Sequence, residues 1–153
     1  MKSFFILISS LIFINMGFTQ SFSDHLWQNR VILLFANEND APLLSKQLEL
    51  LTSYSEEVTN RDLVVHQVFQ LDGRGPRGEM IDGQKVNVLR TDYGIEYEMP
   101  FQFILIGKDG GVKLRSAEVV SMKALFALID GMPMRKAEMK RQKQKKSSKD
   151  SQH

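Results

Sequence analysis

Three apolar runs constrain the fold of this chain more than any other feature of its sequence. They cover residues 30–36, 63–69 and 101–106, and the first contains only apolar side chains after Arg30. A strand with one face in water alternates apolar and polar side chains, whereas a strand buried on both faces reads as a continuous apolar run. The first run therefore predicts a central strand of a parallel sheet.

The segment between the first two runs predicts a helix. Pro42 lies in its first turn, where a missing N–H costs little, and Asp40 precedes it as a candidate N-cap. Strand, helix and strand at these lengths form a βαβ unit with parallel strands. Apolar residues recur at steps of three and four until the helix ends near Thr59–Asn60, namely Leu44, Leu48, Leu51, Tyr54 and Val58.

A second, shorter helix is predicted after a loop. Four glycines and a proline mark residues 72–83 as the loop, and Asp82 is placed to cap a helix over residues 85–93. Gly94 ends this helix, since glycine readily takes the conformation that closes a helix. The side chains expected to face the core are Val86, Leu89 and Tyr93.

The last elements predict how the sheet is completed. An Asp-Gly turn joins runs 101–106 and 112–115 into a β-hairpin, and Ser121 starts a final helix that is broken at 131–133. The apolar stripe expected on that helix is Leu125, Leu128 and Ile129. The order βαβ-α-ββα predicts an α/β, thioredoxin-like fold, a mixed central sheet with helices on both faces.

The N-terminal segment predicts export. Lys2 precedes an apolar run from Phe4 to Phe18, which is too short to cross a hydrocarbon layer of about 30 Å comfortably. A short positive start, a short apolar stretch and small polar residues are typical of a secretory signal peptide, here assigned to residues 1–21. The alternative is an uncleaved membrane anchor. The mature protein, with no transmembrane span expected, would be periplasmic or secreted.

Charge separates the folded body from the C-terminal end. Residues 1–133 carry 12 Lys/Arg and 16 Asp/Glu, whereas residues 134–153 carry 8 Lys/Arg and 2 Asp/Glu. We therefore predict a thioredoxin-like domain over residues 24–132 and a basic tail over 133–153, which starts as a helix and then becomes disordered. For a basic tail on an exported protein, an anionic envelope or extracellular polymer is a more plausible binding partner than nucleic acid. A solvated, solubilising tail is the alternative.

The absence of cysteine from all 153 residues restricts the chemistry. It excludes disulfides, thiolate nucleophiles, cysteine-bound zinc and iron–sulfur clusters. The three histidines, His25, His66 and His153, have no metal-ligand spacing, so the sequence predicts no metal site and no cofactor. His66 is expected to be a hydrogen-bonded residue of the sheet. The motif at 73–78 matches G-x-G-x-x-G but lacks the following helix, so we interpret it as a loop.

The first candidate site follows the first strand, where a thioredoxin places Cys-x-x-Cys. This chain has Asn37, Glu38, Asn39 and Asp40 there, which are good helix caps and cannot exchange disulfides. Capping is the favoured interpretation. The alternative is a non-thiol enzyme that uses these polar residues opposite Pro100.

The second candidate site lies on the hairpin. Lys108, Lys113 and Arg115 cluster around its turn. We expect these cations to be able to bind an acidic partner, either an anionic polymer or the carboxylate-rich face of a protein.

Two resemblances extend this interpretation. The stretch 93–101 resembles the part of thioredoxins that leads through a cis-proline into the hairpin, which implies a cis Met99–Pro100 bond. Residues 27–141 also resemble a family of exported bacterial proteins whose domain recurs in animal sushi-repeat and coiled-coil-domain matrix proteins, the DUDES group. The stretches that carry this second resemblance are 27–31, 61–65, 105–116 and 125–135.

The family resemblance implies a thioredoxin- or peroxiredoxin-like fold, without an established activity in the bacterial members. Its animal relatives are associated with extracellular matrix and adhesion. The sequence as a whole favours an exported, non-catalytic binding or adhesion-type module. The alternative is the non-thiol enzyme.

Overall fold

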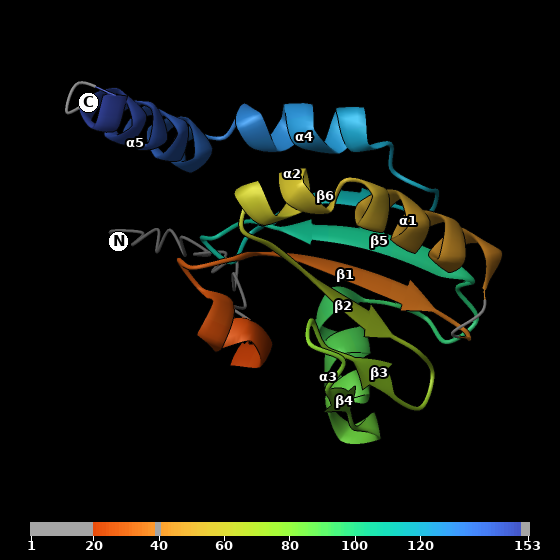
Figure 1. Cartoon of the computed structure of the whole chain (residues 1–153). Helices are drawn as coiled ribbons and strands as arrows, with labels where there is room; N and C mark the ends of the chain where they lie inside the picture. Colours follow the sequence, from red (N-terminus) through yellow and green to blue (C-terminus); the bar gives the residue numbers. More distant parts are fainter. Residues whose placement is uncertain (1–19, 39–40, 151–153) are drawn as a thin grey trace, which may run out of the picture.

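A computed structural model describes residues 20–38 and 41–150 (Figure 1). The strands are β1 (Arg30–Ala36), β2 (Leu63–Val68), β3 (Gly73–Arg74), β4 (Met80–Ile81), β5 (Phe101–Ile106) and β6 (Val112–Ser116). The helices are η1 (Gln20–His25), α1 (Pro42–Ser53), α2 (Ser55–Asn60), α3 (Gly83–Tyr93), α4 (Met122–Asp130) and α5 (Pro133–Asp150). No described helix combines the length and the apolar character that a membrane span requires.

The strands form one mixed sheet in the order β4-β3-β2-β1-β5-β6. The β1–β2 pair is parallel, and β1 pairs antiparallel with β5, which in turn pairs antiparallel with β6. The predicted βαβ unit and the closing hairpin are thus both present. The predicted thioredoxin-like fold is confirmed.

β1 builds two cores because its side chains alternate between the faces of the sheet. Ile32, Leu34 and Ala36 belong to the core that contains the buried residues of α1 and α4. Val31, Leu33 and Phe35 belong to the core on the α3 side. Figure 1 shows α1, α2 and α4 over one face and α3 over the other. Burial on both faces explains why the β1 sequence does not alternate.

The first helix differs from the prediction at both ends. Its N-cap residue is Ala41 rather than the predicted Asp40, which itself lies outside the described residues. Pro42 occupies the start of the helix, and this places Ala41, rather than Asp40, at the N-cap. At the other end, Tyr54 is non-helical and separates α1 from α2. The hydroxyl of Ser53 donates to the Glu49 carbonyl at 2.8 Å, a bond that often bends helices.

The caps of α3 and α4 are confirmed. Asp82 accepts a hydrogen bond from the Lys85 N–H at 2.9 Å, and Ser121 accepts one from Ala124 at 3.3 Å. Gly94 ends α3 with φ of 62°, a conformation that costs glycine little. The expected stripe on α4 holds for Leu125 and Ile129, but Leu128 is exposed and Met122 is buried in its place.

Two further expectations are corrected. The loop over residues 72–83 contains a small hairpin of β3 and β4, which extends the sheet beyond β2. No cis peptide bond occurs among the described residues, so the cis Met99–Pro100 bond is wrong. A trans bond is the ordinary state of an X–Pro pair unless its surroundings fix the other isomer.

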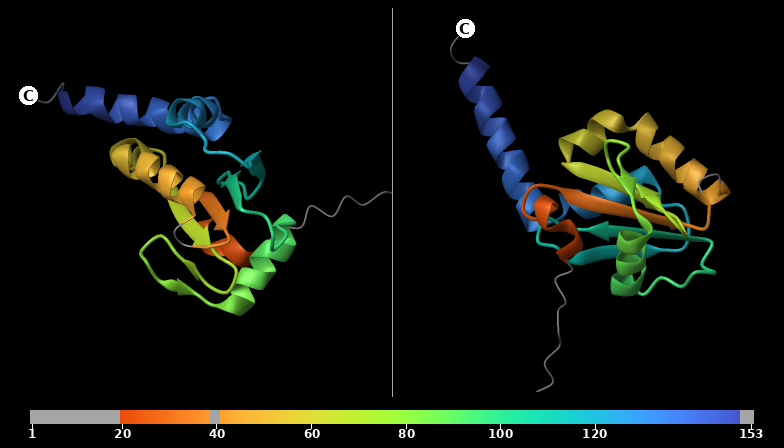
Figure 2. Two further views of the ribbon diagram at one scale, coloured as in Figure 1. Left: turned by 90° about the vertical axis from the view of Figure 1, so that its right-hand side faces the viewer. Right: turned by 90° about the horizontal axis from the view of Figure 1, so that it is seen from below.

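The C-terminal segment is α5, which is helical as far as Asp150. Figure 2 shows this helix leaving the body with its C-terminal half clear of the other elements. Nearly all of the proposed signal peptide, residues 1–19, lies outside the described residues. Its assignment stays a prediction.

Candidate functional site

The position of the thioredoxin cysteines is held by Asn37, directly after β1. With its amide nitrogen turned toward the loop before β5, the side chain donates to the carbonyls of Met99 at 2.7 Å and Tyr97 at 3.0 Å. The structure therefore brings the end of β1 next to the Met99–Pro100 segment, as expected. Asn37 is half-buried and tied to backbone, and both bonds hold the loop in place.

A buried arginine lies at the same edge of the sheet. Arg90 projects from α3 and is only 2% exposed. Its guanidinium donates to the carbonyls of Phe69 at 3.2 Å, Glu96 at 3.1 Å and Ala36 at 3.3 Å. Burial lowers the pKa of Arg90, and the nearby Tyr97 opposes this shift. Arg90 thus joins the ends of β1 and β2 to the loop before β5, a role that its helical position did not indicate.

The structure describes two of the four other predicted residues at this edge. Glu38 and Pro100 are exposed, whereas Asn39 and Asp40 lie outside the described residues. The Tyr97 hydroxyl donates to the Asn87 side chain on α3. Among the residues that the structure describes at this edge, Asn37, Arg90 and Tyr97 are hydrogen-bonded, and no contact places a nucleophile beside a base. Their functional role stays a prediction.

The opposite edge of the sheet holds an ionic cluster centred on Glu138 of α5. Arg30 donates to both Glu138 carboxylate oxygens at 3.2 Å, and the Lys108 ammonium lies 2.9 Å from one of them. Arg135 lies 3.6 Å from the same carboxylate, and Lys108 also pairs with Asp62 at 2.7 Å. Arg30, Lys108 and Arg135 are all under 9% exposed. Glu138 is therefore shared by three buried cations, and Asp62 and Asp130 supply further negative charge to Lys108 and Arg135.

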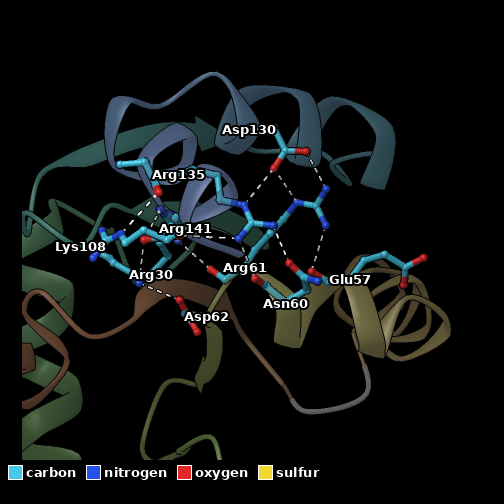
Figure 3. Close-up of polar contacts among 11 residues, drawn as sticks. Arg30, Glu57, Asn60, Arg61, Asp62, Lys108, Asp130, Arg135 and Arg141 are labelled. Atoms are coloured by element: carbon cyan, nitrogen blue, oxygen red, sulfur yellow. Dashed lines mark hydrogen bonds and ion pairs between the residues drawn. The ribbon is translucent and has the colours of Figure 1, made fainter. Parts of the chain in front are cut away.

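A second carboxylate continues the cluster toward α4. Asp130 accepts from Arg61 at 2.6 and 3.0 Å and from Arg135 at 3.3 Å (Figure 3). Arg135 also donates to the Asn60 carbonyl at 2.8 Å. The guanidinium of Arg61 lies 4.1 Å from the centre of the Phe126 ring. These bonds dock the first turns of α5 against the ends of α2 and α4.

The carboxylates of Glu138 and Asp130 have lowered pKa values, although both are partly buried. Burial by itself raises the pKa of Glu138, but hydrogen bonds from Lys108 and Arg30 and the charges of both cations lower it below its usual value. The same balance acts on Asp130, where Arg61 and Arg135 outweigh burial and lower the pKa. Both carboxylates are thus held in the charged form.

This cluster contains residues from all four stretches that carry the family resemblance. Arg30 belongs to the first, Asp62 to the second, Lys108 to the third and Arg135 to the fourth. Stretches far apart in the sequence meet at one edge of the sheet. No local spacing predicts this, because Arg30 and Glu138 are 108 positions apart.

The hairpin cations differ from the expected basic patch. Lys108 is buried and paired inside the cluster, so it is not available to an external anion. Lys113 pairs with Asp109 at 2.7 Å, and Arg115 donates to the Tyr93 carbonyl at 2.8 Å. Binding of an acidic partner by Lys113 and Arg115 stays a prediction.

The outer part of α5 carries cations with a different environment. Residues 140–148 are all exposed. The five cations among them form no ion pair with any carboxylate of the described residues, and they are Lys140, Arg141, Lys143, Lys145 and Lys146. This segment, the basic arm (residues 139–148), extends directly from the turns that hold Arg135 and Glu138.

The G-x-G-x-x-G motif lines a groove. The groove, of 400 Å³, lies between α1–α2 and the loop that contains Gly75 and Gly78. The next helix, α3, begins only at Gly83, so the motif does not open a helix as a dinucleotide site requires. Its polar lining comes from Thr52, Ser55, Thr59, Gln67 and Arg74.

Two histidines meet on the α3 side of the sheet. Their Nε2 atoms are 3.3 Å apart, although His25 lies on η1 and His66 on β2, 41 positions later. His66 is thus a hydrogen-bonded residue of the sheet, as expected, but its partner is His25 on η1, and its Nδ1 has no hydrogen-bond partner among the residues that the structure describes. His25 Nδ1 lies 3.2 Å from the Asn29 side-chain oxygen. Sequence spacing gives no sign of this pair, since only the fold brings η1 onto β2.

Comparison with solved structures shows peroxiredoxins among the similar folds. The thioredoxin peroxidase I of Plasmodium yoelii has a TM-score of 0.52 and 16% identity, over 71% of this chain and 75% of that chain. The reduced 2-Cys peroxiredoxin of Plasmodium vivax has a TM-score of 0.53 and 14% identity, over 71% and 68%. The mitochondrial 2-Cys peroxiredoxin of Plasmodium falciparum has a TM-score of 0.52 and 12% identity, over 71% of this chain and 78% of that chain.

At these identities the likeness extends to the fold alone, and this chain has no cysteine with which to act as those peroxidases do. Comparison with protein families gives a match over residues 21–138, which begins at η1 and ends at the carboxylate that anchors α5. The matched segment contains the whole sheet and every residue of the ionic cluster. The chain belongs to the family described as domain of unknown function (DUF4174).

Proposed function

We propose that this protein is an exported, non-catalytic binding module that holds an anionic polysaccharide on the basic arm of α5. The observation that carries the proposal is the contrast along this one helix. Its first turns place Arg135 and Glu138 in the ionic cluster, whereas its outer turns expose five cations without a carboxylate partner among the described residues. The helix is thus fixed at one end and free to bind at the other.

The electrostatics of the arm favour a polyanion. Lys136 and Lys140, and likewise Arg141 and Lys145, are like charges four positions apart on the helix. Each such pair destabilises a helix by about 0.2–0.5 kcal/mol. A polymer with regularly spaced anions relieves this repulsion along the whole arm, so binding and helix stability reinforce each other.

The other edge of the sheet supports a non-catalytic role. The side chains of Asn37 and Arg90 donate their hydrogen bonds to backbone carbonyls. Glu38 is exposed to solvent, and a catalytic carboxylate is generally desolvated or paired to tune its pKa. The non-thiol enzyme at this edge is therefore the less favoured hypothesis. Export rests on the sequence pattern of residues 1–21.

The proposal is tested by retention on a heparin matrix, with heparin as the anionic polysaccharide. The test variant carries Lys140→Gln, Lys143→Gln and Lys146→Gln. The matched control carries Lys46→Gln, Arg77→Gln and Lys123→Gln, which remove the same charge from exposed positions outside the arm. We expect the test variant to elute at clearly lower salt, and the control to elute close to the parent.

Equal elution of the two triple variants would contradict the proposal, since net charge alone would then explain retention. Far-ultraviolet circular dichroism provides an independent readout. Heparin is expected to raise the helical signal of the parent but not that of the test variant. Exposed charges are screened over about 8 Å at ~0.15 M salt, so both effects should weaken as salt is added.

A further inference from the structure

We propose that His25 and His66 form a binding site for a zinc ion, separate from the basic arm. The two Nε2 atoms face each other at 3.3 Å. Two imidazole nitrogens bound to Zn²⁺ at about 2.05 Å and at the tetrahedral angle lie about 3.3 Å apart. The separation that the two rings have in their mutual hydrogen bond is therefore also that of two ligands of one tetrahedral ion.

The spacing also selects among metals. Adjacent ligands of a square-planar Cu²⁺ ion subtend a right angle, which places two nitrogens only about 2.8 Å apart at bonds of ~2.0 Å. The observed separation fits the wider tetrahedral angle. Of these two geometries, the tetrahedral one that zinc adopts needs the smaller adjustment of the two rings.

The surroundings prepare the histidines as ligands. Asn29 accepts from His25 Nδ1, which fixes the tautomer whose Nε2 lone pair points toward His66. Phe22 packs edge-on against His66, with ring centres 4.8 Å apart, and limits its rotation.

The nearby charges act in opposite directions. Lys85 repels a cation at this position, whereas Glu79 attracts one. The described residues contain no group of three or more His, Cys, Asp or Glu able to hold a metal, so water completes the coordination. Zinc at His66 Nε2 also leaves the proton on Nδ1, which is buried without a hydrogen-bond partner. We therefore expect weaker binding than at a four-ligand structural site.

Zinc titration of the untagged chain in a His153→Gln background tests the site, because only His25 and His66 then remain as histidines. We expect calorimetry to show one zinc ion per chain. His25→Gln should weaken binding at least tenfold, and Asn29→Ala about tenfold through the loss of its bond to His25. Histidine ¹⁵N spectra should show Nε2 of both rings shifting with zinc.

His25 is the half-exposed last residue of η1, so the His25→Gln variant is expected to fold even where a His66 variant does not. Zinc binding of unchanged affinity in folded His25→Gln would overturn the proposal, as would the absence of binding at millimolar zinc. A shift of only one of the two imidazoles would also overturn it. Retention on heparin should be unaffected by these variants, because His25 and Asn29 lie outside the basic arm, so the two proposals are tested independently.

Discussion

Replacement of Glu138 by alanine tests the role of the ionic cluster in docking α5. Glu138 is the carboxylate shared by Arg30, Lys108 and Arg135, which are 1%, 8% and 4% exposed. Its removal leaves buried cations without their common partner. Lys108 keeps Asp62, and Arg30 keeps one bond, to the Arg61 carbonyl at 2.8 Å.

The expected cost follows from this partial compensation. Breaking a buried ion pair by removing one partner costs about 3–5 kcal/mol. Because the Glu138 side chain is 15% exposed and Lys108 retains Asp62, we expect a value near the lower limit, about 3 kcal/mol. Small domains are stable by only about 5–15 kcal/mol, so this loss is a large part of the total.

Urea unfolding followed by circular dichroism measures the effect. With an m-value of about 2 kcal/mol per molar urea, the midpoint should fall by about 1.5 M. Glu118→Ala removes an exposed carboxylate that makes no ion pair with any residue the structure describes, and it should change the free energy of unfolding by less than about 0.5 kcal/mol. Equal midpoints for Glu138→Ala and Glu118→Ala would refute the reasoning.

The same pair of proteins gives a pH test. The folded-state pKa of Glu138 is lowered from 4.5, so its contribution is present above pH 4.5 and is lost as pH falls through the folded-state value. The difference in stability between parent and Glu138→Ala should therefore shrink below pH 4.5. A constant difference down to acid unfolding would show that the charge of Glu138 does not act as described.

Three further predictions concern other parts of the fold. Arg90→Leu leaves three carbonyls without their donor and should lower the free energy of unfolding in urea by about 3 kcal/mol or more. Amide hydrogen exchange in the loop before β5 should also become faster. Unchanged exchange in that loop would contradict the role of Arg90 in joining it to the ends of β1 and β2. Asp82→Ala removes the α3 cap and should cost about 1 kcal/mol, whereas Asp82→Asn should retain most of it. The pKa of His66 falls from 6.5 in the unfolded chain to about 4 in the folded protein, so stability should decrease as pH drops from 6.5 to 4. A His66→Gln variant should lose that slope, and a slope that persists would assign it to another group.

The order of the elements could be predicted because it depends on local signals. The continuous apolar run of β1 identifies a strand buried on both faces, and Asp82, Gly94 and Ser121 mark helix ends through short-range hydrogen bonds and backbone conformation. The hairpin of β5 and β6 follows from its Asp-Gly turn. Each of these signals is contained within a few residues.

The features that were missed depend on tertiary contacts or on segments too short to show a period. β3 and β4 have two residues each, which cannot display alternation. Gln47 resembles a surface residue of a helix, yet it is fully buried and its amide exchanges hydrogen bonds with the Val120 backbone. A polar side chain of this kind is buried only where a distant segment supplies its partners.

In the candidate sites, too, features set by local signals could be predicted and features set by distant contacts could not. The sequence located Asn37 correctly beside the segment before Pro100, because the fold itself fixes that neighbourhood. It treated Lys108 as a surface cation, whereas the fold buries it against Asp62 and Glu138. Charge in a sequence indicates exposure only when no opposite charge from elsewhere in the chain is brought beside it.

The central claim is that α5 is fixed by its first turns and binds through its outer turns. Amide chemical shifts of the ¹⁵N-labelled chain, recorded during titration with a defined heparin oligosaccharide, test it most directly. The account predicts saturable shifts concentrated in residues 139–148, with Asn37, Arg90 and Tyr97 unchanged. Shifts centred on those three residues, or spread evenly over the surface, would contradict it.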